Sequence, residues 1–253
     1  MDDYLDRFKA MVEELKAHPD VVVTHFNIFP PASERSILRA GHEFCAEIPQ
    51  DFMLFYRRTN GLQLRWLWRN TSNFEKLLAK GEKYPELSYD SVYEDDGGVA
   101  GCINIQPIQN VFWNTSFWKE IVYFEEDVDK TTMTWDGNMY PFNAFRKALV
   151  PIDYYHFFYS TLLLSIEKGD DLPLLHSSGY FKNVEWSGFS SFQQYLGFLL
   201  ASKGVVIGRL DVDFFKSKGK ELSNPLGNWH QLDLDRLSYD ETERRFSLGD
   251  SGE

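Results

Sequence analysis

The groups best suited to chemistry in this sequence are closely spaced carboxylates, in two runs: Asp211-Val212-Asp213 and Glu125-Glu126-Asp127-Val128-Asp129. Carboxylates at such spacing can bind a hard cation or act as a general acid and base. Neither run matches a calcium loop, which needs Asp at alternate positions together with a glycine and a terminal Glu. A carboxylate-dependent hydrolase of the glycosidase type stays open, because its two carboxylates need only meet in space. Acidic clusters usually face solvent, so we predict no metal and no cofactor.

Other catalytic patterns are weak. The six histidines lack the i, i+4 spacing of two metal ligands on a helix, and the glycine-rich stretch Asp95–Gly101 lacks the Lys-Ser/Thr of a phosphate loop. Ser190-Ser191 does not lie in a Gly-x-Ser-x-Gly elbow, so no serine hydrolase triad is indicated. Cys45 and Cys102 are isolated in sequence and cannot form a paired-cysteine metal site, so we expect both to be buried thiols. We therefore predict no catalytic residue and no enzyme.

The charge distribution is more informative. The formal net charge is −12, and residues 82–129 hold eleven acids against two lysines, which is nine of the twelve excess charges. This balance argues against direct binding of nucleic acid and favours a basic protein partner. The predicted partner-binding residues are Glu94, Asp95, Asp96, Glu125, Glu126, Asp127 and Asp129. The alternative is that these residues form solvated loops that only keep the protein soluble.

Among the elements that must position such residues, the best marked is the helix predicted from Pro49 to Asn60. Pro49 suits the first helical position, and Asn60-Gly61 supplies a left-handed stop. Phe52, Phe55 and Tyr56 fall on one face, and a strand with alternating side chains follows from Leu62.

Other patterns predict further elements along the chain. Expected helices are Asp3–Lys16, one opened by Pro30-Pro31 with Ile37 and Phe44 inward, Asn70–Lys80, Phe142–Leu149, Asp153–Lys168, one from Ser191 to the stop at Gly204, and a last short helix capped by Ser238-x-x-Glu241. Expected strands are Val21–Val23, Val99–Ile105, Ile121–Phe124 and Thr131–Trp135, the last turning at Asp136-Gly137.

The run Ile48-Pro49-x-Asp51-Phe52-x-x-Phe55-Tyr56-x-x-Thr59-Asn60-Gly61-Leu62 resembles the core motif of the SUKH superfamily, which includes cell-wall-synthesis regulators of the Smi/Knr type. Ile48 stands where Leu is usual, Leu62 replaces a common second Gly, and Gly41-His42 stands where a glutamate is frequent. With the helix around Ser191–Leu196, the resemblance spans about residues 25–204. It implies a non-catalytic domain, since many bacterial members are similar to immunity proteins that neutralise secreted toxins.

Together these patterns predict an α+β fold: a mostly antiparallel, twisted sheet flanked by helices. We expect a SUKH-like domain over residues 1–204, and a packed C-terminal extension over 205–253 that frays at its end. The acidic start and the lack of a long apolar run favour the cytoplasm. The predicted function is binding of a toxin, often a nuclease. The alternatives are a regulatory adaptor of the cell-wall-regulator type and a hydrolase, and the oligomeric state is left open.

Overall fold

The protein has an α+β fold, seen in a computed structural model. The structure describes residues 4–44, 48–83, 99–113, 132–135, 138–141, 149–156, 160–165, 174–178, 183–187, 189, 191–206, 229–240 and 245–248. The chain divides into two compact units: unit 1 is Met1–Asn27, Gln63–Ile103 and Gln193–Glu253, and unit 2 is Ile28–Leu62 and Asn104–Phe192. The predicted boundary at residue 204 stays a prediction. Within the described ranges, no helix is long and apolar enough to cross a bilayer.

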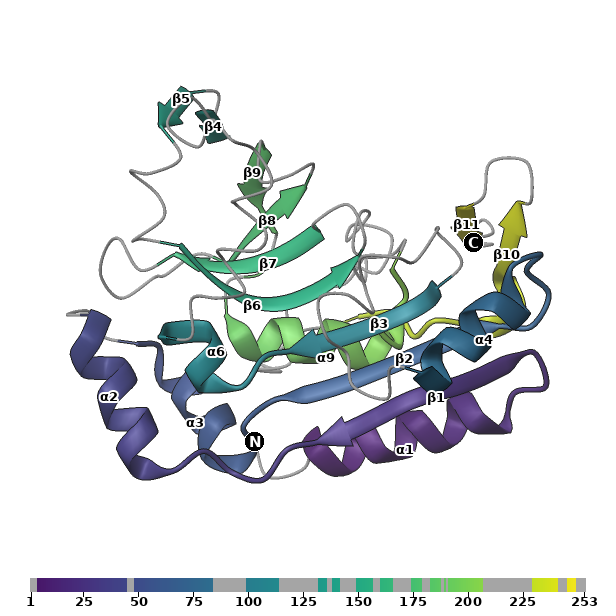
Figure 1. Ribbon diagram of the computed structural model, residues 1–253, viewed down its shortest axis with the longest axis horizontal. Helices are drawn as coiled ribbons and strands as arrows, with labels where there is room; N and C mark the ends of the chain where they lie inside the picture. The colour runs from purple at the N-terminus through teal and green to yellow at the C-terminus, as the bar shows by residue number, and fades with distance from the viewer. Residues whose placement is uncertain are drawn as a thin grey trace. The chain divides into compact units, whose positions relative to one another are not determined.

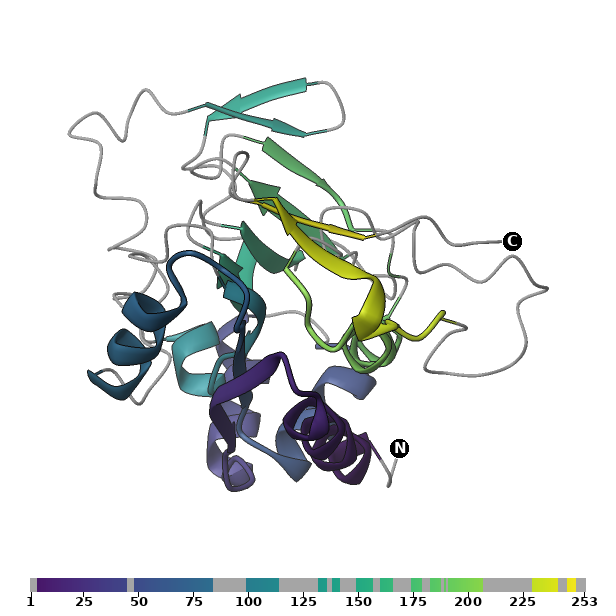
Figure 2. The same cartoon turned by 90° about the vertical axis from the view of Figure 1, so that its right-hand side faces the viewer.

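Unit 1 holds most of three neighbouring strands, β1 (Val21–Ile28), β2 (Leu62–Trp68) and β3 (Val99–Ile105), in that order. Its helices are α1 (Tyr4–Ala17), α4 (Phe74–Lys83) and most of α9 (Phe192–Ser202) (Figure 1). Residues near the C-terminus add the short 3-10 helix η4 (Leu234–Arg236) and the hairpin of β10 (Leu237–Asp240) and β11 (Arg245–Leu248), drawn in yellow in Figure 2.

Helix α1 forms because its apolar residues recur at helical spacing. Tyr4, Phe8, Val12 and Leu15 are buried, while the intervening charged residues face solvent. Lys9 pairs with Asp6 and Lys16 with Glu13, each at 2.8 Å, on that exposed side. The helix predicted over Asp3–Lys16 is thus confirmed to within a residue at each end, and it stops before His18-Pro19 as expected.

Strand β2 is buried along its whole length. The alternation of Leu and Trp with Gln63 and Arg65 is typical of a strand with one wet face, yet every residue from Leu62 to Trp68 is buried. Arg65 is only 1% exposed, and β2 is a central strand between β1 and β3. Gln63 lies 3.1 Å from the ring of His25 on β1, so a polar pair replaces solvent contact.

Unit 2 carries the helices α2 (Glu34–Phe44), α3 (Gln50–Arg58) and α6 (Ile108–Phe112). Its strands are β4 (Thr132–Trp135), β5 (Asn138–Pro141), β6 (Leu149–His156), β7 (Ser160–Ser165), β8 (Leu174–Ser178) and β9 (Asn183–Trp186). They are ordered β6-β7-β8-β9-β4-β5, and all these neighbours are antiparallel except β9 and β4. The end of β3 adds to this sheet, because Ile105 pairs with Asp153 of β6.

The helix predicted over Asp153–Lys168 is wrong. Its described residues lie in β6 and β7, which pair antiparallel with Leu149 opposite Ser165 and Tyr154 opposite Thr161. Strands covered on both faces give continuous apolar runs that periodicity does not distinguish from a buried helix. Of the helix predicted over Phe142–Leu149, only Leu149 is described, and it begins β6. The strand predicted at Ile121–Phe124 lies outside the described residues.

The predicted C-terminal helix is also wrong. Ser238 lies in β10, opposite Ser247 of β11, and their hydroxyl oxygens are 2.7 Å apart. The alternation of Leu237 and Tyr239 with polar residues suits a hairpin, and this pairing outweighs the local capping signal. The strand predicted at Thr131–Trp135 is confirmed as β4. Its register, with Trp135 opposite Asn138, fits a hairpin, although Asp136-Gly137 lie outside the described residues.

Candidate functional site

The family-like motif is centred on α3 in unit 2. Pro49 is the N-cap of this helix (φ −51°), one position before the place predicted for it. Phe52, Phe55 and Tyr56 are fully buried, and the rings of Phe52 and Phe55 each meet Phe192 edge-on, at 5.0 and 5.2 Å between centroids. The prediction of a helix packed by these three residues and followed by a strand from Leu62 is confirmed.

The end of α3 corrects the expected role of Asn60-Gly61. The helix stops at Arg58, and Thr59 is already extended (φ −154°), so Asn60 does not act as a left-handed helix stop. Its side chain instead spans to α6: Oδ1 accepts from the Ile108 amide at 2.9 Å, and Nδ2 donates to Gln109 Oε1 at 3.0 Å. Asn60 thereby satisfies an amide at the start of a neighbouring helix.

Gly61 fixes the turn that follows. Its φ of +128° lies in a region that side chains rarely adopt, and a Cβ there would lie 2.6 Å from the carbonyl oxygen of Ile105. The Gly61 carbonyl also accepts from the Phe29 amide at 3.2 Å. Asn60 therefore links the end of α3 to α6, and Gly61 allows the turn to approach Ile105 closely at the end of β3; we call these two residues the amide node.

A buried polar network lies beside the amide node. Asp153, fully buried, accepts from the Asn104 amide at 2.8 Å, and Gln106 donates to Asn104 Oδ1 at 2.8 Å. The Tyr56 hydroxyl donates to the Gln106 carbonyl at 2.7 Å. Burial, together with the nearby Asp153 charge, raises the pKa of Tyr56 well above 10.0. Tyr56 thus stays protonated at neutral pH as a structural donor.

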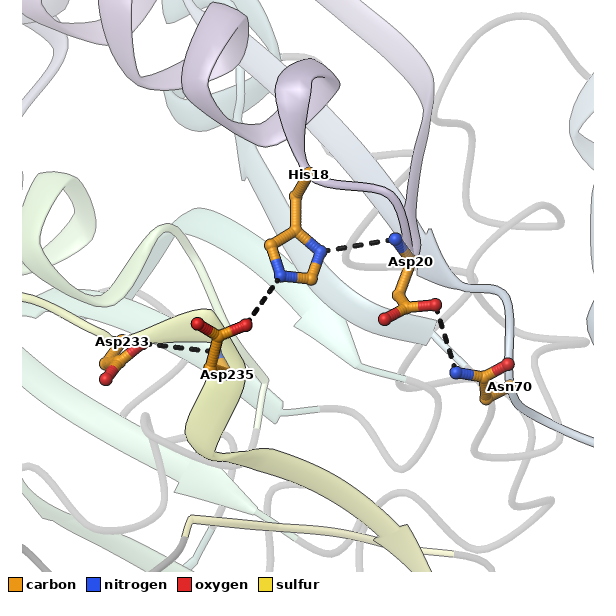
Figure 3. Close-up of polar contacts among 5 residues, drawn as sticks. All are labelled: His18, Asp20, Asn70, Asp233 and Asp235. Atoms are coloured by element: carbon orange, nitrogen blue, oxygen red, sulfur yellow. Dashed lines mark hydrogen bonds and ion pairs between the residues drawn. The ribbon is translucent and has the colours of Figure 1, made fainter.

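Unit 1 contains a second polar cluster, around His18 in the α1–β1 turn (Figure 3). His18 Nδ1 accepts from the Asp20 amide at 3.3 Å, so in the neutral ring the proton sits on Nε2, which faces Asp235 Oδ1 at 3.3 Å. Asn70 holds the Asp20 carboxylate at 3.1 Å, and Asp233 accepts from the Asp235 amide at 3.1 Å.

These contacts suit a structural link between chain segments better than a catalytic dyad. Both ring nitrogens of His18 are already engaged, whereas a general base needs one nitrogen directed at a substrate. The His18 ring also packs against the Trp68 ring in a tilted arrangement, with 5.2 Å between centroids and 32° between the ring planes. The cluster therefore ties residues 233–235 to the α1–β1 turn.

Lys203 is a buried basic residue that no pattern in the sequence marks. Its side chain is 3% exposed, and Nζ donates to the Leu232 carbonyl and to Glu14 Oε1, both at 3.1 Å. Its own carbonyl accepts from the Trp66 indole at 2.8 Å. Lys203 therefore joins α1, β2, α9 and residue 232 at one point, which we call the lysine node.

The backbone at the lysine node is left-handed. Lys203 has φ +52° and Gly204 φ +67°, and the Gly204 amide bonds to the Leu199 carbonyl at 3.1 Å. This is the pattern that ends a helix by a left-handed turn. The predicted stop at Gly204 is confirmed, but the first left-handed residue is a lysine.

The seven predicted partner-binding acids, Glu94, Asp95, Asp96, Glu125, Glu126, Asp127 and Asp129, lie outside the described residues. Whether the two runs converge therefore stays a prediction. Cys102 is a buried free thiol, as expected, while Cys45 also lies outside the described part. Among described residues, no group of three or more His, Cys, Asp or Glu is placed to hold a metal ion.

Comparison with known proteins adds no relative to this site. The sequence matches no family model and no curated protein at a significant level. The interpretation of the site therefore depends on its own residues. Its polar clusters, at Asn60, His18 and Lys203, all make contacts that hold chain segments together.

Proposed function

We propose that this chain is a non-catalytic protein-binding domain of the immunity type, which neutralises a basic toxin, such as a nuclease, in the cytoplasm. The partner-binding residues are Glu94, Asp95, Asp96, Glu125, Glu126, Asp127 and Asp129. The observation that carries the proposal is the concentration of nine of the twelve excess negative charges in residues 82–129. Such a field attracts a basic surface and raises its association rate.

The described structure supports binding more than chemistry. The motif residues Phe52, Phe55 and Tyr56 pack in the core, and Asn60 and Gly61 shape the turn that follows α3. The buried ionisable groups Asp153 and Lys203 are held by short polar contacts within the protein. A rigid framework of this kind suits the display of a binding surface.

The test is neutralisation and association kinetics with the polypeptide encoded beside this gene. Co-expression should restore growth of cells that produce the neighbouring polypeptide, and the purified pair should associate faster at low salt than at high salt. Substituting Glu94, Asp95 and Asp96 together by Lys should lower the association rate constant about tenfold at low salt. The thermal stability should change little, since exposed charges contribute little to folding.

A matched control separates the predicted surface from net charge. Asp6, Glu13 and Glu75 are exposed on α1 and α4, and changing all three to Lys alters the net charge by the same amount. This control should change the association rate constant by less than about twofold. An equal loss in both triple variants, or no binding by the wild type, would contradict the proposal.

A further inference from the structure

Helix α2 in unit 2 has an exposed face that the proposed function does not use. Arg35, Leu38, Arg39 and His42 follow the spacing i, i+3, i+4 and i+7, so they lie along one side of the helix, and all four are exposed. On the opposite side Ile37 and Ala40 are buried. We call the four exposed residues, with Trp113, the α2 face.

Leu38 is the most unusual member of the α2 face. Its exposed fraction is 69%, and among the described residues only Met139, at 71%, is a similarly exposed large apolar side chain. On the helix surface Leu38 lies between Arg35, three residues before it, and His42, four residues after it. An apolar side chain within a cationic rim is the composition of a protein-binding patch.

The face is held in place by the contacts beneath it. Ser33 Oγ accepts from the Ser36 amide at 3.1 Å, as an N-cap does, and Arg57 of α3 pairs with Glu34 at 3.3 Å. The Arg39 guanidinium stacks over the half-buried Trp113 ring, at 4.6 Å from its centroid. Stacking restrains the planar donors of Arg39, so less side-chain entropy is lost when they meet a carboxylate.

We infer that the α2 face binds an acidic segment of a partner protein, one that carries an apolar side chain beside its carboxylates. Arg35 supplies the donors that pair with a carboxylate, Arg39 adds positive charge beside it, and Leu38 with Trp113 supplies the apolar contact. A nucleic acid fits less well, because contacts to its phosphates leave the exposed Leu38 in water. The proposal goes beyond the toxin-binding function, which uses acids elsewhere in the chain and a basic partner.

The test uses a short fluorescein-labelled peptide of glutamates and leucines, with fluorescence anisotropy as the readout. The full-length protein should bind this peptide about tenfold more tightly than the same peptide with serines for leucines. A single-stranded RNA of equal length should bind more weakly than the acidic peptide.

Substitutions then locate the binding. Leu38→Ser and Arg35→Glu should each weaken peptide binding about tenfold, since both residues are exposed and neither change disturbs the core. Met139→Ser and Lys76→Glu are matched controls at exposed positions outside the α2 face and should change binding by less than about twofold. The inference is overturned if the wild type does not bind the peptide, if the controls weaken binding equally, or if RNA binds more tightly. None of these results depends on the toxin.

Discussion

The amide node of unit 2 and the lysine node of unit 1 solve the same problem with opposite chemistry. Each places a left-handed residue where several elements meet: Gly61 with φ +128° and Lys203 with φ +52°. At the amide node, neutral groups of Asn60 join α3 to α6. At the lysine node, one buried ammonium reaches the Leu232 carbonyl and Glu14. A glycine marks such a turn in the sequence, whereas a lysine does not.

The two backbone conformations also differ in how strictly they select a residue. Near φ +52°, a residue with a side chain fits at a cost of about 1–2 kcal/mol. Near φ +128°, with the Ile105 carbonyl 2.6 Å from the missing Cβ, a side chain needs the backbone to move. We therefore expect substitution of Gly61 by a residue with a side chain to lower the free energy of unfolding more than substitution of Lys203 does.

The largest effect is expected at Gly61. Gly61→Val should lower the free energy of unfolding by at least about 3 kcal/mol, through backbone strain and the clash with Ile105. Urea unfolding measures this change. The control is Gly41→Ala in α2, where no atom lies within 4 Å of the added Cβ, and this change should stabilise the protein by up to about 1 kcal/mol. Equal midpoints for wild type and Gly61→Val would show that the turn relaxes freely.

A smaller effect is expected at Lys203, and here glycine should be the milder replacement. Lys203→Ala should cost about 2–3 kcal/mol, because the Leu232 carbonyl loses its donor and the buried stem leaves a void. Lys203→Gly removes the same contacts but relieves the left-handed strain, so it should cost about 1 kcal/mol less than Lys203→Ala. If Ala is the milder replacement, the backbone at residue 203 is not strained.

The same contrast explains which elements of the fold are predictable from the sequence. The α1 helix, α3 and the strands β2 and β3 were predictable because helical spacing, proline and glycine mark them locally. The residues of β6 and β7 were mistaken for a helix because their apolar run lacks a period, and Ser238 was mistaken for a cap because the pairing partner Ser247 is nine residues away. Pairing is decided by segments that the local pattern does not contain.

The polar sites also divide into features marked by local sequence and features that depend on distant segments. The dipeptide Asn60-Gly61 marks a turn in the sequence, but the bond of Asn60 to Ile108, 48 residues along the chain, is not predictable from the dipeptide. Lys203 and the His18–Asp235 contact depend on partners 29 and 217 residues away. No short motif encodes such distances, so the nodes became visible only in the fold.

The smallest effect is expected at Tyr56, and it depends on pH. In the unfolded chain a tyrosine ionises near pH 10.0, whereas burial and Asp153 hold the pKa of folded Tyr56 well above that value. Above pH 10 the unfolded state therefore loses a proton that the native state retains, and the free energy of unfolding falls by about 1.4 kcal/mol per pH unit for this tyrosine. Tyr56→Phe should remove that part of the slope, and should cost about 1 kcal/mol at pH 7, where its bond to Gln106 is lost.

Tyr4 provides a second test, because burial raises the pKa of this tyrosine also, and it lies on α1 in unit 1. Tyr4→Phe should reduce the alkaline slope in the same direction. The deficit of Tyr56→Phe relative to wild type should then shrink between pH 10 and 11 and stay constant between pH 7 and 9, as measured by urea unfolding at each pH. A deficit that is constant up to pH 11 would mean that Tyr56 ionises as readily in the native state as in the unfolded chain. The hydrogen bond to Gln106 would then not hold its proton, and the polar network beside the amide node would be open to water.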